Sequence, residues 1–172
     1  DSENSEVKSP LTKFASSSKY NWPLASTLSN NLEVLYRSDG TTLQMLNLSL
    51  LNSQTLPPIT QIVMKEVDIY SSTMDLKEIG NSLFICSGDF GLHSIDSNLE
   101  STPSLIDIHE RELWCSSLAV ANLGNEELLI ALWSGFDDNE VRIYNSTTKN
   151  LLGSVLINKA NGTDHEGIGW DI

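Results

Sequence analysis

Three histidines are the side chains of this sequence best suited to metal binding or acid–base chemistry. His93, His109 and His165 lie far apart, without the His-x-His or His-Glu-x-x-His spacing that a zinc site uses. The sequence therefore predicts no metal. We expect His109 and His165 to lie at turns or strand beginnings, where an imidazole bonds a Ser, Thr or Asp of a neighbouring strand; the alternative is a catalytic base.

The densest run of carboxylates is Asp137-Asp138-Asn139-Glu140. Oxygen ligands of this kind can bind Ca²⁺, but the run lacks the Asp-x-Asp-x-Asp-Gly pattern of an EF-hand. We interpret it as a turn, because Asp and Asn side chains bond their own backbone there. No Gly-x-Ser-x-Gly, GxGxxG or P-loop motif occurs. The sequence therefore predicts no catalytic residue and no cofactor, and it favours a protein without catalysis of its own.

Two cysteines and two tryptophans lie inside apolar, strand-like runs. Cys86 and Cys115 have no Cys-x-x-Cys spacing, and we interpret them as buried free thiols; a disulfide between neighbouring strands is the alternative. Trp114 and Trp133 fall in two successive expected strands, where core packing is the simplest interpretation and an aromatic anchor for a partner is the alternative.

The charge balance restricts the class of partner. Ten Lys and Arg stand against 23 Asp and Glu, which gives a formal net charge of −13. A chain this acidic cannot displace the counterions that surround the phosphates of a partner. We therefore expect neither nucleic acid nor an anionic membrane surface as a partner. The apolar runs are also shorter than the roughly 18 residues of a spanning helix. A basic peptide or subunit is the partner that this charge favours.

The elements that must position these residues are short strands in a repeat. Helical periodicity is almost absent, and apolar runs of strand length are broken by Gly, Asn, Asp and Ser. Each unit reads as strand, strand, tight turn, strand, linker, strand. In the third unit Val141 and Ile143 alternate with Arg142 and Tyr144, so that one face packs and the other is freer. The middle hairpins fall at 31–49, 81–99 and 126–154, preceded by strands within 22–28, 72–80 and 113–124 and followed by strands within 61–70, 104–110 and 151–157.

This period of about 45–50 residues is typical of a propeller blade. The third unit, LLIALWSGFDDNEVRIYNSTTKNLLGSV, resembles the WD40-type β-propeller family. The resemblance implies that Asp138 braces the tight turn, that Tyr144-Asn145 takes the place of the Trp-Asp dipeptide, and that His165 opens the next blade. Trp170-Asp171 lies in another phase of the repeat, which departs from the family pattern.

The longer stretch HERELWCSSLAV…SGFDD…RIYN…DHEGI, from His109 to Ile168, also resembles the diphthine methylesterase branch of that family. The branch has a His-x-x-Glu-x-Trp strand, a Gly-Gly-Asp-Asp turn and a His-x-x-Gly-Val strand. Phe136 replaces the second Gly of the turn, and the strand lengths differ. The matching positions are His109, Glu112, Trp114, Asp137, Asp138, His165 and Gly167.

We therefore expect an all-β chain of propeller-type, four-stranded blades, about three plus the beginning of a fourth, with a β-sandwich as the alternative. Residues 1–20 are Ser-rich and read as a disordered tail or linker, and 21–172 as the blades of a partial propeller. Such an arc needs further blades from the same or another chain.

The resulting functional hypothesis is a cytoplasmic or nuclear protein–protein interaction scaffold within a larger protein or complex. Its acidic turns, at Asp39, Asp89 and Asp137–Glu140, would form part of a face for a basic partner. One alternative is a diphthine methylesterase-like enzyme. Another is an extracellular adhesive or structural glycoprotein, with sequons at Asn47, Asn145 and Asn161.

Overall fold

The computed structural model describes residues 25–29, 32–38, 42–52, 63–69, 73–110, 113–135 and 138–158. Strands account for most of these residues, and one 3-10 turn, η2 (Leu48–Asn52), accompanies them. Among the described ranges, no helix has the length and apolarity to cross a membrane. The expected tail at 1–20 and the expected start of a fourth unit at 165–172 lie outside the described residues.

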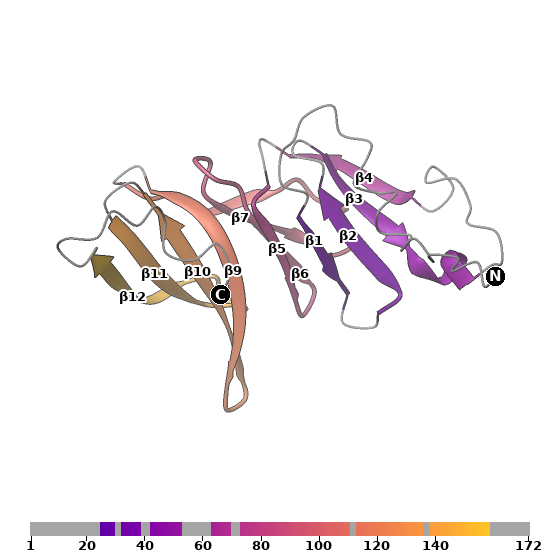
Figure 1. The fold of residues 1–172 in the computed structure, drawn as a ribbon. Helices are drawn as coiled ribbons and strands as arrows, with labels where there is room; N and C mark the ends of the chain where they lie inside the picture. Colours follow the sequence, from indigo (N-terminus) through magenta and orange to yellow (C-terminus); the bar gives the residue numbers. More distant parts are fainter. Residues whose placement is uncertain are drawn as a thin grey trace, which may run out of the picture.

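The strands form three antiparallel sheets of four, each in chain order (Figure 1). Sheet 1 contains β1 (Ser26–Leu28), β2 (Val34–Ser38), β3 (Thr42–Asn47) and β4 (Val63–Asp68). Sheet 2 contains β5 (Asp75–Ile79), β6 (Ser82–Cys86), β7 (Leu92–Asp96) and β8 (Ser104–Asp107). Sheet 3 contains β9 (Trp114–Leu123), β10 (Glu126–Ser134), β11 (Asp138–Asn145) and β12 (Leu151–Asn158).

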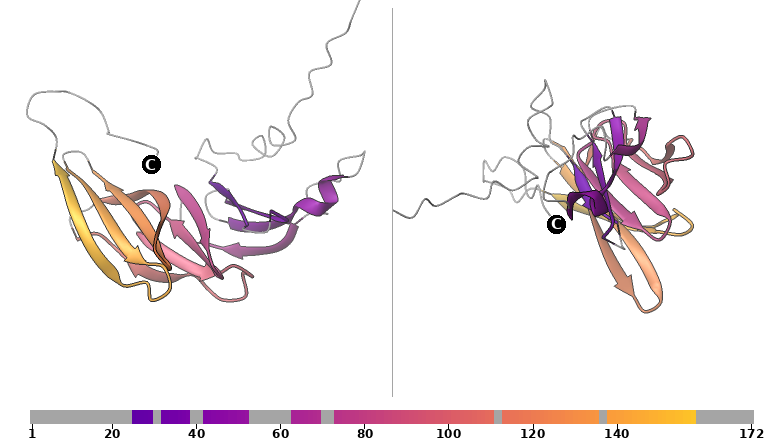
Figure 2. Two further views of the ribbon diagram at one scale, coloured as in Figure 1. Left: turned by 90° about the horizontal axis from the view of Figure 1, so that it is seen from below. Right: turned by 90° about the vertical axis from the view of Figure 1, so that its right-hand side faces the viewer.

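The three sheets follow one another in an arc (Figure 2). The first strands contact each other, β1 with β5 and β5 with β9, and so lie along one side of the arc. Each sheet is a simple meander, unlike the Greek-key connections of a sandwich. The prediction of propeller-type, four-stranded blades is confirmed, and the sandwich alternative is not.

Glycine makes the turns between the first two strands of sheets 2 and 3. Gly80 and Gly124 have φ of +57° and +63°, and each is followed by Asn in a two-residue loop. A tight hairpin turn needs positive φ, which glycine adopts without a Cβ penalty. These turns set the register of the hairpins they close.

Most of the apolar core lies between the sheets. Leu43 and Met45 of sheet 1 pack with Leu76 and Leu83 of sheet 2 in one cluster. The middle sheet is covered on both faces, since Leu83 and Ile85 of β6 belong to that cluster, whereas Phe84 and Cys86 face sheet 3. Two-sided burial explains why β6 reads as the continuous apolar run LFIC.

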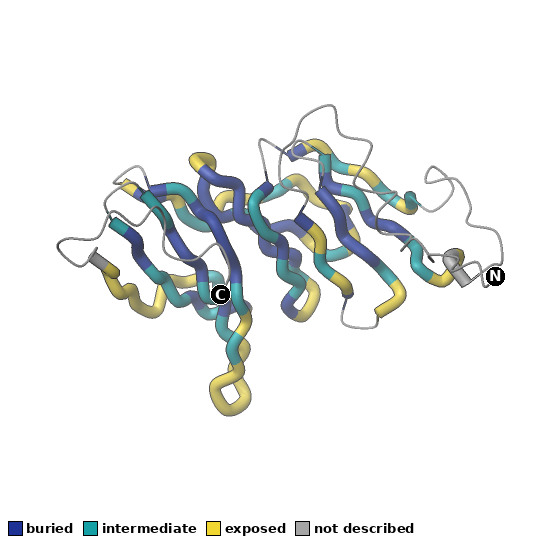
Figure 3. Tube along the Cα trace, in the orientation of Figure 1, coloured by how far each residue is buried: buried dark blue, intermediate teal, exposed yellow. Residues whose placement is uncertain are grey.

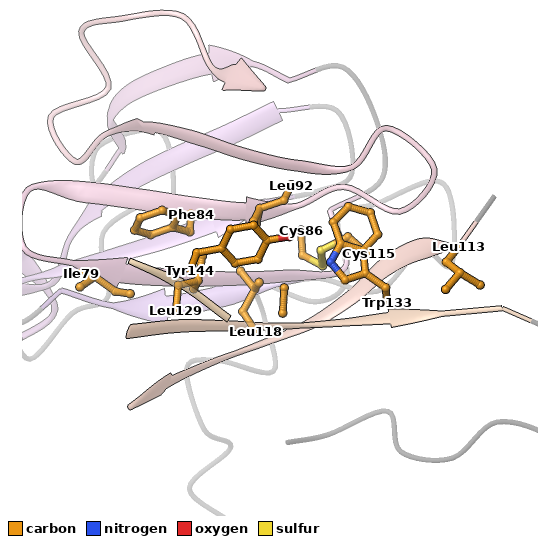
Figure 4. Close-up of a cluster of buried hydrophobic side chains, with 11 residues drawn as sticks. Ile79, Phe84, Cys86, Leu92, Leu113, Cys115, Leu118, Leu129, Trp133 and Tyr144 are labelled. Atoms are coloured by element: carbon orange, nitrogen blue, oxygen red, sulfur yellow. A yellow bond between two sulfur atoms is a disulfide. The ribbon is translucent and has the colours of Figure 1, made fainter. Parts of the chain in front are cut away.

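Cys86 and Cys115 form a disulfide that joins β6 to β9, with their Cα atoms 5.3 Å apart (Figure 4). The prediction of two free thiols is therefore wrong. A bulge in β9 brings Cys115 to the side that faces Cys86: opposite the Leu132/Trp133 step, β9 contains one extra residue. An extra residue reverses strand alternation, so that Cys115 and Leu118, three residues apart, both join the cluster facing sheet 2.

Candidate interaction site between the second and third sheets

A groove with a volume of about 420 Å³ lies between the outer parts of sheets 2 and 3. One wall is β8 and the residues directly after it, and the other is formed by β11, β12 and the loop between them. Apolar and charged side chains share the lining. Its residues are Ile106, Asp107, Ile108, Glu110, Glu140, Arg142, Tyr144, Lys149, Leu151 and Ser154.

Strand alternation places the polar side chains of β11 in this groove. Glu140, Arg142 and Tyr144 are spaced by two and therefore share a face. Their cross-strand neighbours, Trp133 opposite Glu140 and Ser154 opposite Arg142, lie on the same face. The Val/Ile positions of β11 point to the other face, so the side with Arg142 and Tyr144 is the one that packs against sheet 2.

Arg142 lies at the centre of a charged network that joins the two sheets. Its Nη1 donates to Oδ2 of Asp107 at 2.8 Å, and its Nε donates to Oε1 of Glu140 at 3.1 Å. The Tyr144 hydroxyl donates to the same Asp107 oxygen at 2.6 Å. The guanidinium carbon also lies 5.3 Å from the centroid of the Trp133 ring, in a cation–π arrangement. Two strands of sheet 3 and one of sheet 2 are thus joined through one cation.

His109 occupies the inner end of this network. Its Nε2 is hydrogen-bonded to Oε2 of Glu140, and its ring centroid lies 5.7 Å from that of Trp133. The side chain of His109 is only 2% exposed and that of Glu140 is 12% exposed. The imidazole therefore bonds a neighbouring strand, as predicted, although its partner is Glu rather than Ser, Thr or Asp.

The network changes the ionisation of its members. Burial alone would raise the pKa of Glu140, but hydrogen bonds from His109, Arg142 and Ser154 and the Arg142 charge outweigh it and lower that pKa to about 2. Burial and the bond to Asp107 raise the pKa of Tyr144. Burial opposes the charge on Arg142, yet its two carboxylate partners raise its pKa further. At neutral pH Glu140 and the Arg142 guanidinium are therefore ionised, and Tyr144 keeps its proton.

Lys149 is the second cation of the groove and also reaches sheet 2. Its Nζ donates to Oγ of Ser94 at 2.7 Å. Asp107, Glu110 and Glu140 outnumber Arg142 and Lys149, so the lining retains an excess of negative charge. In the described ranges no group of three or more His, Cys, Asp or Glu is arranged to hold a metal ion.

The structure brings only some of the predicted site residues together. His109 belongs to the network. The prediction of an acidic turn at Asp137–Glu140 is wrong from Asp138 onward: Asp138 begins strand β11, its carbonyl accepts from Gly135 N, and Asn139 and Glu140 are buried in the strand. Trp114, at the start of β9, is half-buried, and Asp89 is exposed in the turn between β6 and β7. Asp39, Asp137 and His165 lie outside the described residues.

The sequence reasoning did not single out Asp107, Arg142 and Tyr144 as members of one site. Alternation along β11 could have placed Glu140, Arg142 and Tyr144 together. Nothing local indicates that Asp107, 35 residues before Arg142, meets them. His93 is elsewhere: it is half-buried on β7, beside Ile69 and Ile85, and burial lowers its pKa.

Comparisons with known proteins give structural matches alone. No family model and no curated protein matches the sequence. Hydrazine synthase of Kuenenia stuttgartiensis matches 78% of this chain with a TM-score of 0.60 and 11% identity, over 37% of its own length. The N-terminal domain of Nup159, a β-propeller protein, matches 77% with a TM-score of 0.53 and 18% identity, over 33% of its length.

A third match is to the S. cerevisiae assembly of Dbp5 bound to Nup159, Gle1, IP6 and ADP. It covers 80% of this chain and 35% of the matched one, with a TM-score of 0.52 and 19% identity. Identities this low show a shared fold alone. The chain spans about a third of the length of these structures. Together with its three four-stranded antiparallel sheets, these similarities show that the chain has an all-β fold of propeller-type blades.

Proposed function

We propose that the chain is a non-catalytic protein–protein interaction module, a WD40-like propeller segment that acts within a larger protein or complex and binds a basic protein segment. The observation that carries this proposal is the groove between sheets 2 and 3, whose lining contains one carboxylate more than it has cations and whose two walls are joined by the Arg142–Asp107 ion pair. A protein surface of fixed shape and charge is what a binding module requires, because little conformational entropy is lost on association.

The groove suits an extended basic segment with some apolar side chains. Ile106, Ile108 and Leu151 supply apolar lining, and Glu110 is an exposed carboxylate in the same lining. The exposed Asp89 lies in the turn that precedes β7, and the Leu92 end of β7 pairs with Asp107 at the groove. The net charge of −13 would speed the approach of a basic partner. The Dbp5 assembly with Nup159 supports a protein partner for a propeller of this kind.

The His109–Glu140 pair favours this interpretation over the diphthine methylesterase-like enzyme. A general base must reach the proton of its substrate. The side chain of His109 is only 2% exposed and its Nε2 is bonded to the largely buried Glu140, so a substrate has no access to this ring. The second histidine that the enzyme hypothesis needs, His165, lies outside the described residues.

A labelled Lys/Arg-rich peptide tests the proposal by fluorescence anisotropy at low and high salt. Glu110→Lys should weaken binding about fivefold, which corresponds to about 1 kcal/mol for a partly screened charge reversal. Glu126→Lys is the matched control, because it changes the charge equally but lies at the far end of β10 from Ser134. Equal losses in both variants, or no binding by the wild type, would contradict a specific acidic site.

The disulfide favours a second candidate, the extracellular adhesive or structural glycoprotein. Disulfides persist in oxidising compartments and are rare in the cytoplasm and nucleus, which are the compartments of the first proposal. Two sequons also lie at strand ends: Asn47 ends β3 and Asn145 ends β11. Intact mass after expression in secretory eukaryotic cells separates the candidates, since glycan on Asn47 or Asn145 supports the second and unmodified chains with free thiols support the first.

A further inference from the structure

The turn between β6 and β7 has the sequence SGDFG, residues 87–91, and it exposes an aromatic side chain. Phe90 is 51% exposed, whereas the other aromatic residues in the described ranges are buried or, at Trp114, half-buried. Asp89 and Phe90 form an exposed tip between the buried Gly88 and Gly91 (Figure 3). A single exposed apolar side chain is ordinary on a protein surface. Phe90 differs in how firmly it is held and in what lies beside it.

The backbone of this turn is fixed from two directions. Inside the turn, Phe90 N donates to Ser87 O at 3.0 Å. Gly88 and Cys115 exchange two main-chain hydrogen bonds, of 3.2 and 3.0 Å, which join the turn to β9. Cys86, directly before the turn, forms the disulfide with Cys115. The turn therefore presents Phe90 in a defined position, so that little conformational entropy is lost when a partner packs against the ring.

The same turn lies against the wall of the groove between sheets 2 and 3. A Cβ on Gly91 would collide with the carbonyl oxygen of Asp107 and would lie 3.3 Å from the Cα of Ile108. Both Asp107 and Ile108 line the groove, and Ile108 is 52% exposed. Phe90 precedes Gly91 in the chain, so their Cα atoms are about 3.8 Å apart. Phe90 and Ile108 therefore lie within side-chain reach of the same stretch of groove wall, and we call these two residues the apolar rim.

Acidic side chains flank the apolar rim on both sides. Asp89 directly precedes Phe90, and Glu110 lies two residues after Ile108 in the groove lining. Both acidic residues are exposed. A purely basic segment in the groove would leave the rim exposed to water, and a purely apolar segment would place uncharged groups against Asp89 and Glu110. The surface is complementary to a segment that carries both kinds of side chain.

We propose that Phe90, together with Ile108, is the apolar anchor of the groove, and that the partner is an extended segment in which an apolar side chain stands between Lys or Arg residues. This inference rests on the proposed function, because it names the kind of sequence that the groove selects. The acidic side chains attract any basic segment. Burial of an apolar side chain against the phenyl ring distinguishes one basic segment from another.

Fluorescence anisotropy with two labelled peptides tests this inference. Both peptides have the same length and alternate Arg with Ser, and the second carries Leu in place of the central Ser. The wild type should bind the leucine peptide at least about fivefold more tightly than the serine peptide, because the leucine becomes partly buried. This ratio should persist in about 0.5 M salt, where both affinities fall, since salt screens charges but not apolar burial.

Phe90→Ser should lower the ratio to below about twofold and leave the affinity for the serine peptide unchanged, because it removes the ring but no charge. Ile108→Ser, on the other side of the rim, should lower the ratio as well, and Phe90→Tyr keeps the ring and should keep the ratio. Leu123→Ser is the matched control, since Leu123 is 68% exposed but lies at the end of β9 away from Trp114. Thermal unfolding of each variant shows whether it is folded.

The outcomes separate this inference from the function on which it rests. Equal binding of the two peptides by the wild type, a ratio that survives Phe90→Ser, or an equal loss in Leu123→Ser would overturn the inference and leave the proposed function standing. Binding of neither peptide would overturn the proposed function, and the inference with it.

Discussion

The Arg142 network provides the sharpest test of how sheets 2 and 3 are held together. Arg142→Met keeps the length and most of the apolar volume of the side chain but removes the cation. Asp107 and Glu140 then remain as two carboxylates without their shared guanidinium, and the cation–π contact with Trp133 is lost. The hydrogen bonds from Tyr144 and His109 remain in place.

The expected loss of stability follows from burial. Removing one partner of a fully buried ion pair costs about 3–5 kcal/mol, and an exposed pair is worth at most about 1 kcal/mol. The side chains of Arg142, Glu140 and Asp107 are 14%, 12% and 21% exposed, so the network lies nearer the buried limit. With screening by the groove solvent, we expect Arg142→Met to lower the free energy of unfolding by about 2 kcal/mol.

Urea unfolding followed by tryptophan fluorescence measures this loss, and Trp133 beneath Arg142 reports on the site itself. Lys65→Met is the matched control, because Lys65 also joins two sheets but pairs with the 71% exposed Glu100, and it should cost less than about 1 kcal/mol. If Arg142→Met costs under about 0.5 kcal/mol, or no more than Lys65→Met, the network does not hold the sheets together and the reasoning fails.

Three other predictions concern acid, reduction and a turn. The pKa of Glu140 falls from 4.5 to about 2 on folding, so its contribution to the free energy of unfolding is complete above pH 4.5 and disappears as the pH falls toward 2. After discounting for solvent this contribution is about 2 kcal/mol. Glu140→Gln should therefore flatten the pH dependence of the urea midpoint between pH 4.5 and 2. Reducing the Cys86–Cys115 disulfide, whose separation is 29 residues, should lower stability by up to about 3.5 kcal/mol, measured by thermal unfolding with and without reductant, and the Cys86→Ser/Cys115→Ser double variant should be insensitive to reductant. Gly91→Ala should destabilise by about 1–3 kcal/mol in urea, since Gly91 has φ of +91° and a Cβ would collide with the carbonyl oxygen of Asp107; unchanged stability would show that the backbone of this turn relaxes freely.

The strands and their grouping were predictable from sequence, because they depend on local chemistry. Short apolar runs with period two, separated by Gly, Asn and Asp, define a hairpin meander wherever they occur. The three units expected from the repeat coincide with sheets 1, 2 and 3. Gly80 and Gly124 mark the same turn in two sheets, so the register of these hairpins is also a local property.

The candidate site was predictable only in part. His109 bonds a neighbouring strand, but its partner is Glu140 and not the expected Ser, Thr or Asp. The interpretation of the acidic run as a turn was wrong from Asp138 onward, because Asp138–Glu140 belong to β11 and Glu140 is buried. Alternation along β11 contains the information that Glu140 and Arg142 share a face, but not which face packs against sheet 2. The apolar Val141 and Ile143 would suggest the opposite face, which the structure leaves half-buried.

By itself, the sequence determined an acidic, all-β chain of repeated four-stranded units, because composition and period-two patterns act over a few residues. Tertiary structure alone decided which distant residues meet. Asp107 reaches Arg142 across 35 residues, and Cys86 reaches Cys115 only because a bulge in β9 turns that cysteine toward sheet 2. Contacts between sheets depend jointly on the twist, the bulges and the packing of whole strands, so a local sequence pattern does not predict them.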